Sequence, residues 1–184
     1  MLFAILSLAY AVAIASLLFS ASLLAHELGH AAAGRLLGLR VGRIVAGNGP
    51  WLVRLGKLEV RLFGLNGACE FSRPLHIEPA RTRALVALAG PAASLVASAG
   101  FHLLAIVTAG AVANVSATMA AANLALAIFN LVPIPPLDGW QAAEPALERL
   151  GWLRLGSGQR ARLYSAGMAL IFASTAVFFA WRWS

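Results

Sequence analysis

Charged residues are scarce in this chain. They make up 11% of its 184 residues, whereas hydrophobic residues make up 60%. Soluble domains carry about a quarter charged residues, so this composition argues against a soluble domain and predicts an integral membrane protein. No polar stretch is long enough to hold a separate soluble domain. We therefore expect residues 1–184 to form a single membrane domain.

Cysteine, aspartate and lysine each occur only once. Cys69 is the sole cysteine, which excludes an internal disulfide and a metal cluster built from thiolates. Asp138 is the sole aspartate. Basic residues outnumber acidic ones by 14 to 7, a balance found both in nucleic-acid-binding proteins and in the cytoplasmic loops of membrane proteins. The basic residues cluster between apolar runs, so we expect contact with the lipid bilayer and no nucleic acid.

Long apolar runs supply the spans that a bilayer requires, about 20 residues each. From Leu2 to Gly34 the only charge is Glu27, and Ala84 to Pro133 contains no charged residue. The second run is long enough for two helices, and Gly110, Asn114 and Ser116 mark the expected turn between them. The predicted spans are about residues 3–34, 84–109, 117–132 and 163–181.

The segment of about residues 38–80 differs from the spans because it is polar and basic. Within it, Leu58–Leu62 alternates between apolar and charged residues, which indicates a half-exposed strand. We predict a small β-sheet or hairpin at the membrane surface; an irregular loop is the alternative. The expected fold class is an all-α polytopic membrane protein of about four transmembrane helices with this small sheet between spans one and two.

Basic residues also fix the expected orientation. Arginines and a lysine lie in residues 35–83 and between the third and fourth spans, on one side of the membrane. The positive-inside rule places both segments in the cytoplasm and both termini outside. The Ala-, Arg- and Gly-rich composition suggests a prokaryotic inner membrane.

The sequence His26-Glu27-Leu28-Gly29-His30 lies in the last third of the first span. Residues four apart share a helix face, so His26 and His30 can present two imidazoles to one metal ion. Glu27 is then within reach of a metal-bound water, as its general base. A chance pattern is the alternative, but such groups are costly inside a membrane and usually functional. The motif lies about 13 Å from Arg35 along the helix, near the cytoplasmic surface.

A second polar site follows the third span, in the segment from Asn130 to Gly139. Its prolines end the helix, and broken backbone at membrane depth is tolerated where it is buried or meets a watery cavity. We predict Asp138 as the third metal ligand; a helix N-cap is the alternative. Asn130 would hold the substrate or a developing oxyanion, or else bond a neighbouring helix.

These motifs resemble those of the site-2 protease family of intramembrane zinc metalloproteases. His26–His30 fills the family's H-E-x-x-H, and Asn130–Gly139 fills its N-x-x-P-x-P-x-L-D-G. Gly90–Ser94 is similar to its G-x-x-x-(N/S/G) element, and these small residues suit close packing, which we expect against the metal helix. Two long motifs in register are a far more specific signal than H-E-x-x-H alone.

The resemblance implies a three-helix catalytic core and one Zn²⁺ per chain, bound by His26, His30 and Asp138. It implies that Glu27 is the general base on a zinc-bound water. It implies contact between the substrate and Asn130, Pro133 and Pro135. The implied substrate is a transmembrane helix that unwinds locally, and the strand at Leu58–Leu62 would hold it by β-addition.

The function that we expect is therefore an intramembrane zinc metalloendopeptidase that cleaves membrane proteins in or near their transmembrane helices. A catalytically silent adaptor that binds transmembrane helices is one alternative, although it would not need all four polar residues. A metal transporter is another, although its ligands would span the bilayer. The oligomeric state is left open by the sequence.

Overall fold

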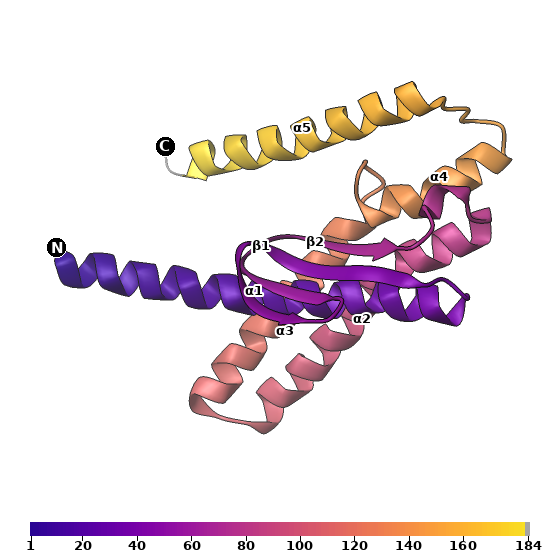
Figure 1. The fold of residues 1–184 in the computed structure, drawn as a ribbon. Coiled ribbons are helices and arrows are strands. Elements are labelled where there is room, and N and C mark those ends of the chain that lie inside the picture. The colour runs from indigo at the N-terminus through magenta and orange to yellow at the C-terminus, as the bar shows by residue number, and fades with distance from the viewer. Residues whose placement is uncertain (183–184) are drawn as a thin grey trace.

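The computed structural model describes residues 1–182 of the chain. Helices dominate, and a small sheet follows the first helix (Figure 1). The elements in chain order are α1 (Leu2–Leu36), β1 (Val41–Leu55), β2 (Leu58–Phe71), a short 3-10 turn (Leu75–Ile77), α2 (Ala80–Val107), α3 (Gly110–Leu131), α4 (Asp138–Arg149) and α5 (Ser157–Arg182).

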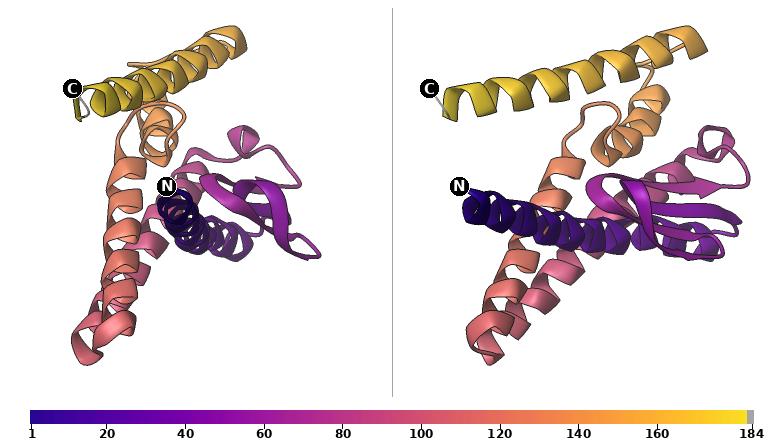
Figure 2. Two further views of the ribbon diagram at one scale, coloured as in Figure 1. Left: turned by 90° about the vertical axis from the view of Figure 1, so that its left-hand side faces the viewer. Right: turned by 60° about the vertical axis from the view of Figure 1, so that its left-hand side comes forward.

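Three helices, α1, α2 and α3, are long and apolar enough to cross a membrane. They pack against one another, with α2 and α3 forming a hairpin that crosses α1 at an angle (Figure 2). Helices satisfy their own backbone hydrogen bonds, which is what the bilayer interior requires. Three such helices support an integral membrane protein.

The turn between α2 and α3 differs from expectation by a few residues. The chain leaves the helical conformation at Thr108 and Ala109, and α3 begins at Gly110, where φ is +63°. Glycine adopts such a φ without the steric cost that other residues incur. The third helix therefore begins before Ala117, where the sequence had suggested its start.

Helices α1 and α2 approach closely at small residues. A Cβ added to Gly29 of α1 would lie 2.6 Å from the Cβ of Ala93 on α2. Such contact is possible only where side chains are absent or minimal, as in many membrane helix pairs. The expected packing of the Gly90–Ser94 segment against the metal helix is confirmed.

The sheet is formed by β1 and β2, which pair antiparallel. Three residues of β1, Ile44, Val45 and Ala46, have two partners each, residues 58–60 on one side and residues 67–69 on the other. Residues 58–60 pair on their second side with residues 53–55. The outer segments of the sheet are therefore residues 51–55 and 67–71, and the Leu58–Leu62 strand lies inside it.

The sheet is attached to α1 by two serines. Ser16 Oγ donates a hydrogen bond to the Leu62 carbonyl (2.9 Å), and Ser20 Oγ donates one to the Arg61 carbonyl (3.0 Å). Gly64 lies so close to α1 that a Cβ there would be 2.7 Å from the Ser20 nitrogen. The sheet therefore covers the half of α1 that carries the histidines.

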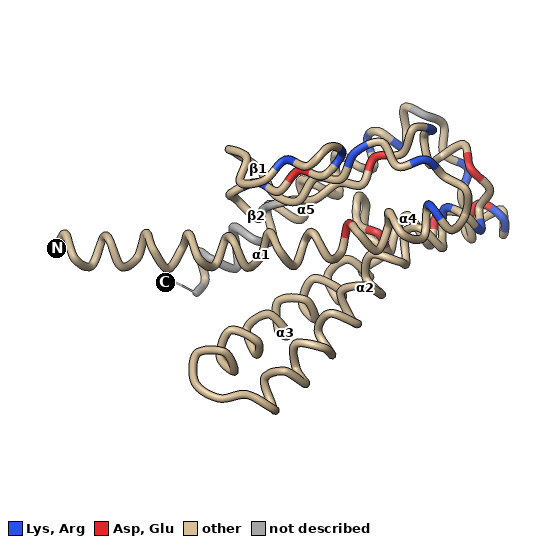
Figure 3. The backbone as a smooth tube through the Cα atoms, turned by 60° about the horizontal axis from the view of Figure 1, so that its bottom comes forward, with Lys and Arg blue, Asp and Glu red and all other residues tan. Residues whose placement is uncertain are grey.

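Charged residues gather at one end of the molecule (Figure 3). This end comprises the sheet, the C-terminal end of α1, α4 and the first turns of α5, whereas the α2–α3 turn carries no charge. Helix α5 is held there by Arg160, whose Nε donates to Glu144 Oε1 of α4 at 2.7 Å. It corresponds to the expected fourth span, and its crossing of the membrane stays a prediction.

Candidate metal centre

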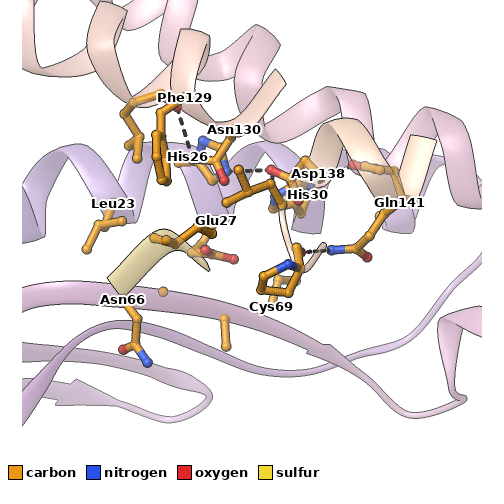
Figure 4. Close-up of a pocket in the computed structure, with 18 of the residues that line it drawn as sticks. Leu23, His26, Glu27, His30, Asn66, Cys69, Phe129, Asn130, Asp138 and Gln141 are labelled. Carbon is orange, nitrogen blue, oxygen red and sulfur yellow. Dashed lines mark hydrogen bonds and ion pairs between the residues drawn. The ribbon is translucent and has the colours of Figure 1, made fainter. Parts of the chain in front are cut away.

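Two histidines of α1 and an aspartate 108 residues beyond the second of them converge on one point (Figure 4). His26 Nε2 lies 2.9 Å from Asp138 Oδ2, and His30 Nε2 lies 3.3 Å from the same oxygen. All three residues are buried. The imidazoles meet edge to face with ring centroids 4.9 Å apart.

The other ring nitrogens are held by α2. His30 Nδ1 lies 2.7 Å from the Val86 carbonyl oxygen, and His26 Nδ1 lies 3.0 Å from Ser94 Oγ. A carbonyl only accepts, so the Nδ1 of His30 carries the proton. In the neutral imidazole, Nε2 then presents a lone pair to the carboxylate oxygen, and either a proton or a metal cation between the two atoms would balance this arrangement.

The donor set fits zinc. Two atoms bound tetrahedrally at about 2.0–2.1 Å from Zn²⁺ are about 3.3 Å apart, close to the separations of 2.9 and 3.3 Å found between the nitrogens and Asp138 Oδ2. Two imidazoles and one carboxylate leave one tetrahedral position open, as in hydrolytic zinc sites. Hydrogen bonds from the second ring nitrogens also orient metal-ligating histidines in general.

A glycine makes room for the two rings. A Cβ added to Gly90 of α2 would collide with His30 Nε2 and would lie 2.7 Å from His26 Nε2. No side chain therefore fits at this position while both imidazoles keep their places. Gly90 and Ser94, one helical turn apart, thus supply the space for the histidines and one of their hydrogen bonds.

Glu27 lies beside the cluster and faces β2. One carboxylate oxygen of Glu27 and one nitrogen of each histidine lie within 4.8 Å of one another. A Cβ added to Gly67 would lie 2.9 Å from the Glu27 carboxyl carbon, so the β2 backbone passes directly over this side chain. Glu27 is therefore set beside the His–Asp triad rather than inside it.

The N-cap alternative for Asp138 is wrong. Leu137 occupies the N-cap of α4, without a side-chain capping bond, and Asp138 is the first helical residue. Its carboxylate turns to the two histidines instead. The start of α4 lies close to the backbone at the end of α3. Gly139 makes this possible, because a Cβ there would lie 2.7 Å from the Val132 carbonyl oxygen.

A cavity of about 530 Å³ opens onto these residues. Its walls are largely apolar and come from α1, β2, α2, α3, the start of α4 and α5. Figure 4 shows part of this lining. Helix α5 contributes Met168, Ile171 and Phe172. A mainly apolar cavity with a few converging polar groups is the usual form of a ligand-binding site.

The three residues that the resemblance assigned to substrate binding have different environments, and only one of them lines the cavity. Asn130 lines the cavity, and its Nδ2 donates to the Leu126 carbonyl at 3.0 Å. Pro133 is exposed, and Pro135 packs against Gly167 of α5. Pro136, next in the chain, lines the cavity. The proline segment thus reaches the cavity through Pro136 and supports α5 through Pro135.

Sequence reasoning missed several residues at this site. Gly67 and Asn66 line the cavity from β2, and Gln141 lines it from α4. The Asn66-Gly67 pair has the composition of a turn, although it continues β2. Gln141 is three residues from Asp138, a helical spacing that could have placed it on the same face.

A buried His–Glu–His cluster among helices that could cross a membrane is the arrangement expected of a membrane metalloprotease. Residues 14–112 and 105–174 match the model of peptidase family M50. The chain is 36% identical over 158 residues to the "Putative zinc metalloprotease Rip3" of Mycobacterium tuberculosis strains Erdman and H37Rv. The match covers 83% of this chain and 35% of those relatives. The chain therefore belongs to peptidase family M50, the site-2 proteases.

A solved structure shares the fold. The site-2 protease from Methanocaldococcus jannaschii matches 89% of this chain and 67% of its own, with a TM-score of 0.62 and 20% identity. The chain spans about a third of the length of its curated mycobacterial relatives.

Proposed function

We propose that this chain is an intramembrane zinc endopeptidase that hydrolyses peptide bonds in or near transmembrane helices. The observation that carries the proposal is the convergence of His26, His30 and Asp138, with two nitrogens at 2.9 and 3.3 Å from one carboxylate oxygen. An adaptor has no use for this buried donor set. A transporter would need ligands spread across the bilayer, whereas these three converge on one point.

His26, His30 and Asp138 would hold the zinc. When bound, the ion supplies a Lewis acid that polarises the scissile carbonyl and acidifies a water molecule. Glu27 accepts the proton of the attacking water and delivers it to the leaving nitrogen. The missing side chain of Gly67 leaves the room that the Glu27 carboxylate occupies. Asn130 binds the substrate backbone from the α3 side of the cavity.

The substrate would bind as an extended strand along residues 67–71 of β2. Within the described part of the chain, this segment pairs with residues 41–46 alone, and its residues 67–69 line the cavity beside Glu27. An edge strand binds an extended peptide through main-chain hydrogen bonds. The expectation that Leu58–Leu62 would bind the substrate as an edge strand is wrong, because residues 58–60 are already paired on both sides. Substrates whose transmembrane helices unwind easily are therefore favoured.

Cleavage of single-span substrates in liposomes tests the proposal. Wild-type protein with zinc should cleave, and Glu27→Gln should lower kcat by about 10²–10⁴-fold, the usual contribution of a general base. Zinc content should stay the same in this variant, because Glu27 is not a ligand. Ser98→Ala, a substitution on α2 away from the cavity, serves as the control and should keep full activity.

Two outcomes would contradict the proposal. Purified wild-type protein that binds no zinc would exclude the metalloprotease mechanism. Equal cleavage by wild type and Glu27→Gln, with zinc in both, would show that another residue is the base.

A further inference from the structure

Three polar side chains lie at the membrane-interior side of the metal site, one from each core helix. They are Ser22 of α1, Ser94 of α2 and Asn123 of α3, and each is completely buried. Polar groups are costly inside a membrane and are generally kept there for a function. Asn123 commits both amide hydrogens, to Ser22 Oγ at 3.0 Å and to the Met119 carbonyl at 2.8 Å.

The three residues lie at one level of the helix bundle. Ser98 Oγ of α2 donates to the Ala120 carbonyl of α3 at 2.8 Å. Because α2 and α3 run in opposite directions, Ser94, one turn earlier on α2, lies level with Asn123, about one turn later on α3. Ser22 is one turn before His26 on the same face of α1.

The hydrogen bond between Asn123 and Ser22 joins the two halves of the metal site. The histidines belong to α1, whereas Asp138 is carried by the chain that leaves α3. Any sliding or rotation of α1 against α3 changes the distances of 2.9 and 3.3 Å between the imidazoles and the carboxylate. Asn123 makes this bond although its own Oδ1, within the described structure, has no partner.

We propose that Ser22 and Asn123 are positioning residues of the metal site, whose hydrogen bond fixes α1 against α3 so that His26, His30 and Asp138 meet. This inference rests on the proposed zinc site. Neither residue lines the cavity. Their contribution is to hold the ligands at bonding distance before the ion arrives.

Zinc affinity, measured by chelator competition on the purified full chain, tests the inference. Ser22→Ala and Asn123→Leu should each weaken zinc binding by about 10- to 100-fold, the usual effect of losing an outer-shell partner. The double variant should be no weaker than the single ones, because all three lose the same bond. Ser98→Ala, which removes an α2–α3 hydrogen bond without touching α1, should keep wild-type affinity.

Several results would overturn the inference. Wild-type affinity in a folded Ser22→Ala variant would do so, and this substitution removes only one oxygen, so it keeps the test valid if Asn123→Leu misfolds. Strictly additive losses in the double variant would also overturn it. Equal weakening by Ser98→Ala would point to general packing. Absence of zinc from the wild type would instead contradict the proposed function itself.

Discussion

Each imidazole at the metal site depends on a residue that has no side chain at all. Gly90 of α2 faces both rings, and a Cβ there would lie 2.7 Å from His26 Nε2. Gly90→Ala should therefore displace the rings and weaken zinc binding by about tenfold or more, as losses around metal ligands do. Zinc stoichiometry after dialysis against a weak chelator measures this.

Gly100, on the same helix, provides the matched control. A Cβ at Gly100 meets nothing within 4 Å. Gly100→Ala should keep zinc and stabilise α2 slightly, because alanine is about 1 kcal/mol better than glycine in a helix interior. Equal zinc binding by Gly90→Ala and wild type would contradict the assigned role of Gly90.

Cys69 is a chemical probe of the cavity wall. Burial raises the pKa of the Cys69 thiol to about 12, and the nearby Glu27 carboxylate adds to this effect. A raised pKa favours the neutral thiol, so below pH 8 the folded protein should hold about a thousandfold less thiolate than an ordinary cysteine. Iodoacetamide labelling should therefore be slow, should quicken as pH rises, and should become fast in denaturant. A rate that denaturation leaves unchanged would contradict this.

At the residue scale, the sequence was informative where chemistry is local. The spacing of His26 and His30 placed both on one helix face, and the structure brings both rings together. Asp138 stood out because it is the sole aspartate and because its segment resembles a known motif. The contacts of Gly67 and Asn123 depend on how separate elements meet, and no local pattern encodes them.

At the element scale, α5 is fastened to α4 by a buried ion pair. Arg160 contacts Glu144, which is almost fully buried, and also Glu148, which is bound in turn by Arg83 of α2. Arg160→Met should cost about 2–4 kcal/mol, because it leaves a buried carboxylate without its partner. Proteinase K should then cut the segment between α4 and α5 faster.

Two further variants serve as controls for the proteolysis experiment. Arg162→Met, on the exposed surface in the same turn, should leave the proteolysis rate unchanged. Arg160→Met combined with Glu144→Gln should be less damaging than Arg160→Met alone, because the unpaired charge is gone. Equal proteolysis of Arg160→Met and wild type would show that α5 is held by other contacts.

Element boundaries were predicted unevenly from the sequence. The first helix was placed well, because an uninterrupted apolar run has few alternatives. The sheet was expected, but its edge was misplaced, because the alternation of Leu58–Leu62 reports half-exposure and not which neighbour lies on each side. Double pairing of Ile44, Val45 and Ala46 puts that strand in the interior of the sheet.

At the scale of the whole molecule, the uneven distribution of charge predicts the orientation in the membrane. Basic residues gather at the sheet, α4 and the start of α5, and this end should face the cytoplasm (Figure 3). In a Cys69→Ser background, cysteines at Arg73 and Arg154 should react with an impermeant maleimide only in inverted vesicles. A cysteine at Ala109, in the α2–α3 turn, should react only from the outside of intact cells. The reverse pattern would contradict the orientation.

The central claim is that one zinc ion is held by two histidines and one aspartate, with Glu27 outside the ligand set. Zinc K-edge X-ray absorption on wild type, Glu27→Gln and Asp138→Ala tests it most directly. We predict one zinc per wild-type chain, with two imidazole nitrogens and a carboxylate oxygen at about 2.0–2.2 Å. The spectrum should be unchanged in Glu27→Gln, and Asp138→Ala should lose the carboxylate or the metal. A spectrum that changes in Glu27→Gln but not in Asp138→Ala would contradict the account.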